Sequence, residues 1–148
     1  MNTTKAPIEE LNAYLKGEYM AIDSYKKYIN KATDPAVKAD LECILQDHTR
    51  HAQLIADRIR QLGGEPAQSV DLMGKMGQLM NSIKNITEKS DVEICQEACY
   101  WEEQGSKMGM EVVKGDLDPT SCALIKDIYA KDMEHIDKLK KHIEYKNL

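Results

Sequence analysis

Residues 130–136 read AKDMEHI and place a carboxylate, Asp132, three residues before an imidazole, His135. On an α-helix, residues at this spacing project from one face, so both side chains can reach a common point. Leu124, Ile128 and Leu139 recur at the same helical phase. The pair therefore points toward the expected core, where ionisable groups are costly. Either it binds a metal ion, or it is a satisfied, hydrogen-bonded pair.

The same features recur earlier in the chain at a fixed offset of 84 residues. The positions related by this offset are Glu18 and Glu102, Asp34-Pro35 and Asp118-Pro119, Leu41 and Ile125, Ile44 and Ile128, His48 and Asp132, and His51 and His135. The sequence therefore predicts two copies of one helical hairpin. Each copy carries a Glu on its first helix and a polar residue, three positions before a His, on its second.

The composition favours a single all-α domain. The chain has 148 residues, of which 30% are charged and 5% aromatic, with 4 Pro and 8 Gly. A net charge of −5 and a pI near 5.4 argue against nucleic acid or an anionic membrane surface as a partner. No apolar run approaches a membrane span, and the N-terminal sequence MNTTKAPIEE does not resemble a signal peptide, so we expect a cytoplasmic protein.

The four cysteines, Cys43, Cys95, Cys99 and Cys122, form no C-x-x-C pair. Without such pairs the chain cannot form a rubredoxin-type iron centre. In a reducing compartment we expect free, mostly buried thiols. Cys95 and Cys99 lie one helical turn apart on the side that carries Glu102, so a redox or ligand role for these two is the alternative.

The first helix is predicted at about residues 7–32, beginning at Pro7, which suits a first helical position. Glu18 lies in the middle of its apolar stripe, apart from the charged residues of the solvated face. A carboxylate in that place needs a partner. The partner is either a metal ion or a Tyr or Lys side chain.

The second helix is predicted at about residues 35–62, from the N-cap Asp34 to the stop signal Gly63-Gly64. At 100° per residue, His48 lies near the centre of its apolar stripe and His51 at the edge. Asp47 lies farther round and is the weaker candidate. We therefore predict that the two histidines face inward as a pair.

Residues 63–89 form a connector, within which a short amphipathic helix is predicted. The residues that carry this pattern are Val70, Met73, Met76, Met80 and Ile83. The methionine row suits packing, with a soft-metal or ligand surface as the alternative. A connector of this length can run the length of a bundle, which would leave the second and third helices parallel.

The third and fourth helices are predicted at about residues 90–114 and 119–146. Ser90 and Glu93 form a capping box at the start of the third helix. Glu102 and Glu97 flank its apolar stripe on opposite sides, and only Glu102 has a counterpart at the 84-residue offset. We therefore select Glu102 as the candidate ligand on this helix.

These positions predict one site, at mid-height of a four-helix bundle, made by Glu18, His48, His51, Glu102, Asp132 and His135. Here the chain resembles the ferritin-like di-iron carboxylate superfamily, especially its small bacterial rubrerythrin-like and demethoxyubiquinone-hydroxylase-like members. The resemblance covers about residues 7–145 and rests on GEYMAIDSY around Glu18, QDHTRHA around His51, YWEEQ around Glu102 and AKDMEHI around His135. It implies a ferritin-like fold and a metal site built from these six residues.

Two positions depart from the family pattern. His48 stands where the family has a bridging Glu, and Asp132 replaces a longer Glu. An imidazole binds through one nitrogen and does not normally bridge two cations. The three carboxylates and three imidazoles carry a charge of −3, against −4 for the family pattern. The resemblance implies two iron ions, and the ligand set also suits manganese or zinc.

If two irons bind, the resemblance implies chemistry with oxygen or hydrogen peroxide, with an electron donor that the sequence does not identify. Tyr25 lies two turns after Glu18 on the same face. It is either a hydrogen-bond donor to a ligand carboxylate or a core tyrosine satisfied elsewhere. Its counterpart at the offset is Gly109, whose small size could open a pocket beside Glu102 for an oxidant or a small substrate.

Three functions follow as hypotheses. The first is a di-metal oxidoreductase that acts on oxygen or peroxide. The second is an iron-binding or ferroxidase-type protein, which a shell-forming oligomer would support and a monomer or homodimer would weaken. The third is a structural four-helix bundle without stable metal, which would be indifferent to a chelator.

Overall fold

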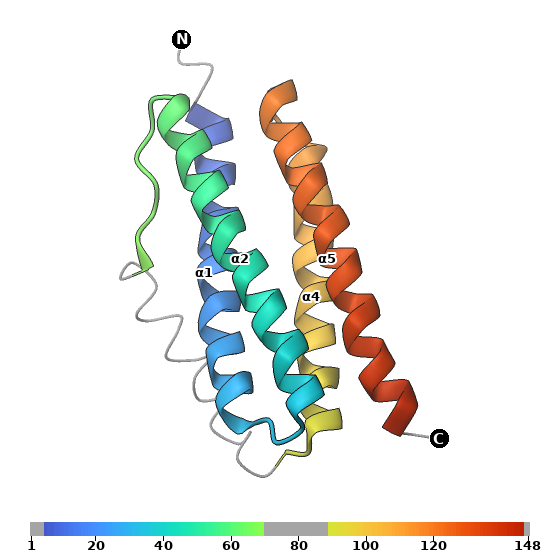
Figure 1. The fold of residues 1–148 in the computed structure, drawn as a ribbon. Coiled ribbons are helices and arrows are strands. Elements are labelled where there is room, and N and C mark those ends of the chain that lie inside the picture. The colour runs from blue at the N-terminus through green and yellow to red at the C-terminus, as the bar shows by residue number, and fades with distance from the viewer. Residues whose placement is uncertain (1–4, 70–88, 147–148) are drawn as a thin grey trace.

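The computed structural model describes residues 5–69 and 89–146. Its helices are α1 (Lys5–Lys31), α2 (Pro35–Gln61), α4 (Asp91–Val113) and α5 (Pro119–Lys146) (Figure 1). Within these ranges no residue is in a strand, and the predicted all-α bundle is confirmed. None of the described helices has an apolar stretch long enough to cross a lipid bilayer. The short helix predicted from the methionine row falls on residues 70–88, outside the described ranges.

The helix ends follow the local signals in the sequence. The side chain of Asp34 caps α2 by accepting a hydrogen bond from the Ala36 N–H at 2.9 Å. At the other end, Gly63 has a φ of 86°, which glycine adopts without strain. This conformation lets the N–H groups of Gly63 and Gly64 donate to the carbonyls of Arg60 and Ile59, each at 2.9 Å. The chain then leaves the helix axis at this point.

Two aspartates at helix starts also tie the hairpins together. Asp91, in the first turn of α4, accepts hydrogen bonds from the backbone N–H groups of Thr33 and Asp34 at 3.0 and 2.7 Å. Asp118 accepts from the Ser121 N–H at the start of α5 and from Nη2 of Arg58, near the end of α2, at 2.7 Å. At each end of the bundle, the two hairpins are therefore joined by polar contacts between a loop and a helix end.

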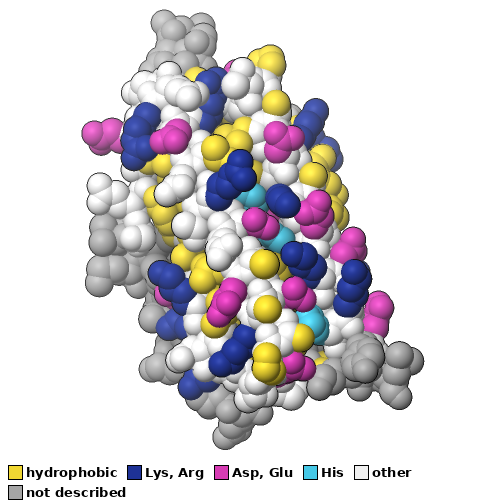
Figure 2. Space-filling model, in the orientation of Figure 1, with side chains coloured by type: hydrophobic (Ala, Val, Ile, Leu, Met, Phe, Trp, Pro, Cys, Tyr) yellow, Lys and Arg dark blue, Asp and Glu magenta, His cyan; other side chains and the backbone are white. Residues whose placement is uncertain are grey.

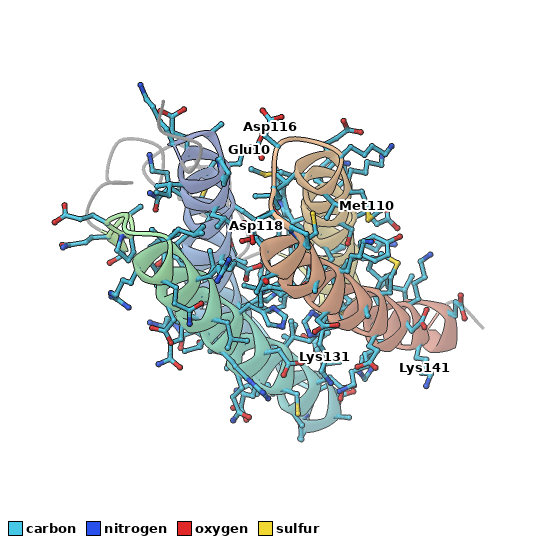
Figure 3. The ribbon with its side chains drawn as sticks, turned by 90° about the horizontal axis from the view of Figure 1, so that it is seen from above. Glu10, Met110, Asp116, Asp118, Lys131 and Lys141 are labelled. Atoms are coloured by element: carbon cyan, nitrogen blue, oxygen red, sulfur yellow. The ribbon has the colours of Figure 1, made fainter. Side chains whose placement is uncertain are left out.

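The four helices form two antiparallel hairpins, α1 with α2 and α4 with α5 (Figure 1). The helices α2 and α4 run in the same direction, as the length of the connector predicted. Seen from above, the hairpins lie side by side and their side chains meet along the bundle axis (Figure 3). On the face formed by α2 and α5, charges of both signs are interspersed, and histidine atoms show at the seam (Figure 2).

The apolar interior consists of two separate clusters. One cluster lies toward the α1–α2 turn and includes Tyr28, Leu41, Ile44, Ile94 and Leu139. The other lies toward the opposite end and includes Leu11, Leu15, Ile55, Ile59 and Ile128. Both are almost completely buried, and the buried side chains between them along each helix are polar. This polar layer at mid-height holds the candidate site.

Candidate metal centre

The structure brings all six predicted site residues together in the polar layer. Glu18 comes from α1, His48 and His51 from α2, Glu102 from α4, and Asp132 and His135 from α5. Each side chain belongs to a residue that is at most 5% exposed. Because each is fixed at the middle of a long helix, backbone freedom at this level is small. The layer therefore presents a preorganised set of atoms that could hold a metal ion.

His48 lies between two carboxylates. Its Nδ1 donates to Oε2 of Glu18 at 2.7 Å, and its Nε2 donates to Oε1 of Glu102 at 2.6 Å. Burial disfavours the charged imidazole, but Glu18 and Glu102 outweigh burial and raise the pKa of His48 well above its usual value. Without metal, an imidazolium thus occupies this position, where the family that the chain resembles has a bridging Glu, and it balances the charge of its neighbours.

Glu102 accepts a second strong hydrogen bond, from the hydroxyl of Tyr25 at 2.7 Å. Of the two roles considered for Tyr25, the structure shows the hydrogen bond to a carboxylate of the layer. Burial raises the pKa of Glu102, but His48 and His135 outweigh this effect and hold it well below its usual range. Glu102 is therefore ionised at neutral pH, with its orientation fixed from two sides.

His135 is oriented by Asp47, which the helical phase of α2 had ranked as the weaker candidate. Nε2 of His135 donates to Oδ2 of Asp47 at 2.8 Å. Its Nδ1 then faces Oε1 of Glu102 at 3.4 Å and Oδ1 of Asp132 at 3.6 Å. The phase calculation missed Asp47 because it measures distance from the stripe of α2 alone. The side chain instead faces α5, and the partner it meets there depends on how the two helices pack.

Two further groups of the layer are held neutral in the metal-free protein. Burial, with the charges of Glu102 and Glu18, raises the pKa of Asp132 to about 9. Burial lowers the pKa of His51 to about 4, against the attraction of Glu18. At neutral pH, Asp132 is thus protonated and His51 is uncharged. A cation entering the layer would release the proton of Asp132 and recover its carboxylate as a ligand.

The unsatisfied atoms of the layer provide a test of whether a metal fits. Nδ1 of His51, Nδ1 of His135 and Oδ1 of Asp132 are buried and have no hydrogen-bond partner. Such orphaned atoms are costly unless something binds them. Two sets of ligand atoms, each within a 4.8 Å span, could hold an ion: His48, Glu102, Asp132 and His135, and Glu18, His48 and His51. These nitrogen and oxygen donors suit iron, manganese or zinc.

The cysteines stand apart from both sets of ligand atoms among the described residues. All four are free; Cys95 and Cys99 are buried, and Cys43 is exposed. Burial, helped by the charge of Asp91, raises the pKa of Cys95 to about 12. This thiol is therefore protonated at neutral pH, which disfavours the alternative of a ligand or redox role for it.

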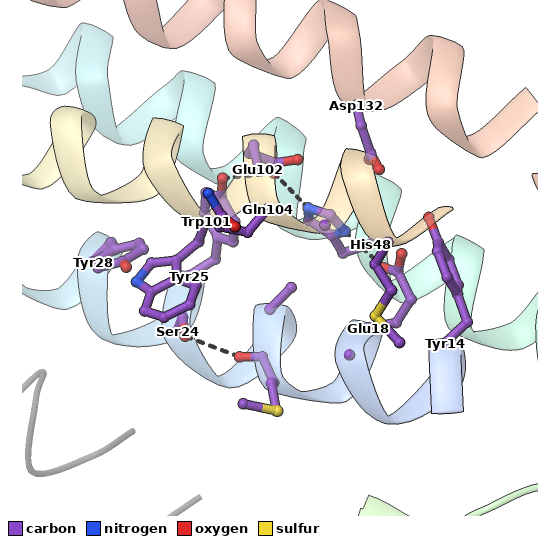
Figure 4. Close-up of a pocket in the computed structure, with 15 residues that line it drawn as sticks. Tyr14, Glu18, Ser24, Tyr25, Tyr28, His48, Trp101, Glu102, Gln104 and Asp132 are labelled. Atoms are coloured by element: carbon purple, nitrogen blue, oxygen red, sulfur yellow. Dashed lines mark hydrogen bonds and ion pairs between the residues drawn. The ribbon is translucent and has the colours of Figure 1, made fainter. Parts of the chain in front are cut away.

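Gly109 does not open the pocket that its small size suggested. A Cβ added there would lie 3.2 Å from Cε2 of Tyr14, whose ring fills the space. A pocket beside Glu102 exists, but it lies one turn farther from this contact, at Gly105, between α1 and α4 (Figure 4). The prediction of open space at Gly109 was wrong. It rested on the 84-residue offset, at which Gly109 takes the place of Tyr25, but the ring that packs on Gly109 is that of Tyr14.

Residues 6–115 match the sequence pattern of a family described as Domain of unknown function (DUF2383). The match covers most of the chain. The chain belongs to the DUF2383 family. The matched range contains all of α1 but its first residue, together with α2 and α4, and stops before α5, which supplies Asp132 and His135 to the layer. No curated protein matches this DUF2383 chain.

Solved structures with the same architecture are ferritin-like. The bacterioferritin-related protein of Bacteroides fragilis, described as a dodecameric thioferritin, is 24% identical, with a TM-score of 0.80 over 95% of this chain and 86% of that one. The bacterioferritin of Desulfovibrio desulfuricans is 23% identical, with a TM-score of 0.77 over 99% and 83%. A ferritin-like, diiron-carboxylate protein from Bacillus anthracis is 21% identical, with a TM-score of 0.70 over 97% and 99%. This DUF2383 chain therefore has the ferritin-like four-helix-bundle fold.

Proposed function

We propose that the polar layer binds two divalent metal ions, with iron as the expected metal, and that the loaded protein reacts with oxygen or hydrogen peroxide. The observation that carries this proposal is the set of three buried ligand atoms without partners, on His51, Asp132 and His135. A layer that had lost metal binding would be expected to pair these atoms or to replace them with apolar groups. The DUF2383 chain keeps them between two apolar clusters.

Five of the six residues divide into two groups in this proposal, and His48 lies between the groups. Glu18 and His51, from the first hairpin, would hold one ion, and Glu102, Asp132 and His135, all from the second hairpin, would hold the other. Bound ferrous ions would supply the electrons that reduce the oxidant. The protein fixes one end of this arrangement through Tyr25, which orients Glu102, and through Asp47, which leaves Nδ1 of His135 free as a ligand atom.

His48 has a different part in the two states of the site. In the metal-free protein its imidazolium lies between Glu18 and Glu102 and donates one short hydrogen bond to each. His48 belongs to both groups of residues whose ligand atoms could hold an ion. An incoming ion must displace at least one of these protons, so His48 competes with metal for the same carboxylates. We expect weaker metal binding than a bridging carboxylate at this position would give.

A ferroxidase-type function is the second candidate. It is supported by the likeness in fold to proteins described as a dodecameric thioferritin and a bacterioferritin. In this case iron would be the substrate, and the protein would assemble into a shell. Light scattering of the purified protein separates the candidates, since a large closed oligomer supports the second and a monomer or homodimer counts against it.

Elemental analysis of protein purified without added metal, and again after anaerobic ferrous loading, tests the proposal. We expect two irons per chain in the wild type and none in a His51→Ala, His135→Ala double variant. His142→Ala is the matched control because His142 pairs with Asp40 at 2.7 Å outside the layer, and it should keep both irons. One iron per chain would mean that His48 blocks the second position. No iron after loading would leave a structural bundle.

His48→Glu sharpens this test. It provides the bridging carboxylate that the ferritin-like pattern has, and it removes the competing imidazolium. We expect tighter binding of both irons than in the wild type. His48→Gln, which removes the imidazolium but adds no carboxylate, should gain less, and the difference between the two variants measures the contribution of the added carboxylate. Consumption of oxygen or peroxide by the loaded wild type then decides between a metal-binding protein and an oxidoreductase.

A further inference from the structure

A pocket of about 250 Å³ lies between α1 and α4 and reaches the polar layer. Glu18, His48, Glu102 and Asp132 line its inner side. Tyr14 and Tyr28 stand at its two ends, with Trp101 and Ser24 between them (Figure 4). Trp101 and Met108 are 44% and 39% exposed, and they line its outer part. The pocket thus connects half-exposed apolar side chains to the candidate metal ligands.

Two glycines keep this pocket open. A Cβ added at Gly17 or at Gly105 would meet no atom within 4 Å, and both residues line the pocket. Glycine inside a helix costs about 1 kcal/mol relative to alanine. Neither residue has a positive φ that would require glycine. The backbone conformation therefore does not require glycine at these two positions, whereas it does at Gly63.

The chemistry of the lining selects an uncharged molecule. Among the described residues that line the pocket there is no Lys or Arg, and the two carboxylates Glu18 and Glu102, which outnumber the His48 imidazolium, would repel an anion. A cationic molecule would have to leave water, while both carboxylates are already engaged by His48 and Glu102 also by Tyr25. The hydroxyls of Ser24 and Tyr25 already donate, to the carbonyl of Met20 at 2.9 Å and to Glu102. The lining therefore favours an apolar body.

Among the described residues that line the pocket, two buried polar atoms have no partner: Oδ1 of Asp132, which belongs to the polar layer, and the hydroxyl of Tyr28. The hydroxyl of Tyr28 has no hydrogen-bond partner, although the residue is only 1% exposed. A buried hydroxyl without a partner is unfavourable, and this one belongs to a residue at the end of the pocket. A hydroxyl or carbonyl oxygen on the bound molecule could accept its hydrogen bond.

We propose that this pocket binds a small uncharged molecule with a ring-sized apolar body and one hydroxyl or carbonyl group. An apolar cavity of about 150 Å³ can hold benzene, so 250 Å³ suits one ring with a short substituent. The molecule lies with its body against Gly17 and Gly105 and its oxygen at Tyr28. That it serves as the organic substrate of the metal site rests on the proposed function, whereas the binding itself does not.

Fluorescence of Trp101, the single tryptophan of the chain, reports on this pocket directly. The probes are benzyl alcohol, benzoate and benzylamine, which share a ring and differ in charge at neutral pH. We expect a saturable change with benzyl alcohol and none with the two ions. Equal responses to all three probes, or a response to benzyl alcohol that does not saturate, would overturn the proposal.

Variants at the glycines and at Tyr28 locate the binding. Gly105→Leu should fill the pocket and abolish binding, while Gly105→Ala, which adds only a Cβ in open space, should keep most of the affinity. Tyr28→Phe should weaken benzyl alcohol about 3- to 10-fold, the loss of one hydrogen bond, and leave toluene unaffected. Calorimetry confirms the affinities without relying on Trp101. Unchanged binding in Gly105→Leu would place the molecule elsewhere and refute the assignment.

Iron content of the same samples separates this proposal from the proposed function. Saturable binding of benzyl alcohol in protein that takes up no iron would support the pocket and refute the metal site. Iron uptake without saturable binding of benzyl alcohol would support the metal site and refute the pocket. Gly105→Leu should retain the iron of the wild type, because Gly105 supplies no ligand atom.

Discussion

Asp47 on α2 accepts a hydrogen bond from Nε2 of His135 on α5 at 2.8 Å, and this bond turns Nδ1 of the same ring toward Glu102 and Asp132. Removing the acceptor frees the ring to rotate and to change tautomer. We therefore expect Asp47→Ala to lower metal affinity about 10- to 100-fold, the usual effect of losing such a partner. Titration of ferrous or zinc ions in competition with a chelator measures the change.

Asp40→Ala is the control for Asp47→Ala. Asp40 accepts a hydrogen bond from His142 at 2.7 Å between the same two helices, but outside the polar layer. The Asp40→Ala substitution should leave metal affinity unchanged. Equal losses in the two variants would show that the effect is a general weakening of the contact between α2 and α5, and would contradict the role given to Asp47.

Two buried tyrosines on α1 should differ in what their hydroxyls contribute to stability. The hydroxyl of Tyr25 donates to Glu102, whereas that of Tyr28 has no partner. A hydrogen bond to a charged group contributes about 1.5–3 kcal/mol. Tyr25→Phe should therefore lower the free energy of unfolding by about 2 kcal/mol, and Tyr28→Phe should change it little. Urea denaturation in the presence of chelator checks both, and similar losses would refute this distinction.

The stability of the metal-free protein should fall as pH rises from about 6.5 to 9, since below 6.5 the lowered pKa of His51 makes stability rise with pH and opposes the effect of Asp132. Burial, with Glu102 and Glu18, raises the pKa of Asp132 from its ordinary value of 3.8 to about 9. Because the pKa of Asp132 is higher in the folded than in the unfolded protein, its proton contributes fully to stability below the unfolded-state pKa. This contribution is lost as pH rises through the folded-state pKa. The raised pKa of His48 acts in the same direction. Glu102, whose pKa is lowered, is ionised throughout this window.

Asp132→Asn isolates this effect. At pH 7 the wild type carries a cost of about 1.4 kcal/mol for each of roughly three pH units above the ordinary pKa of Asp132, or about 4 kcal/mol. The amide does not carry this cost, so the variant should be more stable in chelator by up to about that amount, with a flatter pH profile. It should also bind metal more weakly. Asp127→Asn, at an exposed position of α5, should reproduce the wild-type profile.

Metal binding at pH 7 should release protons from Asp132 and His48. Both are protonated in the metal-free layer and both belong to the sets of candidate ligand atoms. Apparent affinity should therefore rise with pH. Calorimetric titrations in two buffers of different ionisation enthalpy count the protons, and Asp132→Asn should release one fewer. Binding heats that are independent of buffer would contradict these protonation states.

The fold followed from the sequence because local signals and long-range pattern agreed. The caps at Asp34 and Ser90, the stop at Gly63, and the 84-residue repeat of ligand-type residues each specified the same four helices. The convergence of six polar residues was also predictable, since they share the buried faces of their own helices. Helical phase determines which way a side chain points, and in this chain every apolar stripe points to one axis.

Contacts between helices were less accessible from the sequence. Asp47 lies off the stripe of α2, and only the approach of α5 turns it into a partner of His135. The ring of Tyr14 fills the space at Gly109 because antiparallel packing brings these positions together. The repeat pairs Tyr14 with Ala98 instead. An offset in sequence relates equivalent positions of two hairpins, and it does not say which positions touch.

The division of the interior into two apolar clusters separates what holds the helices together from what reacts. Leu11 and Ile59 at one end, and Ile44 and Leu139 at the other, pack without contribution from the polar layer. A substitution in the layer therefore leaves both clusters intact. The backbone that carries His48 and Asp132 is still the ferritin-like four-helix bundle. A scaffold of this kind can evolve a new metal preference or a new reaction one ligand at a time, without passing through an unfolded ancestor.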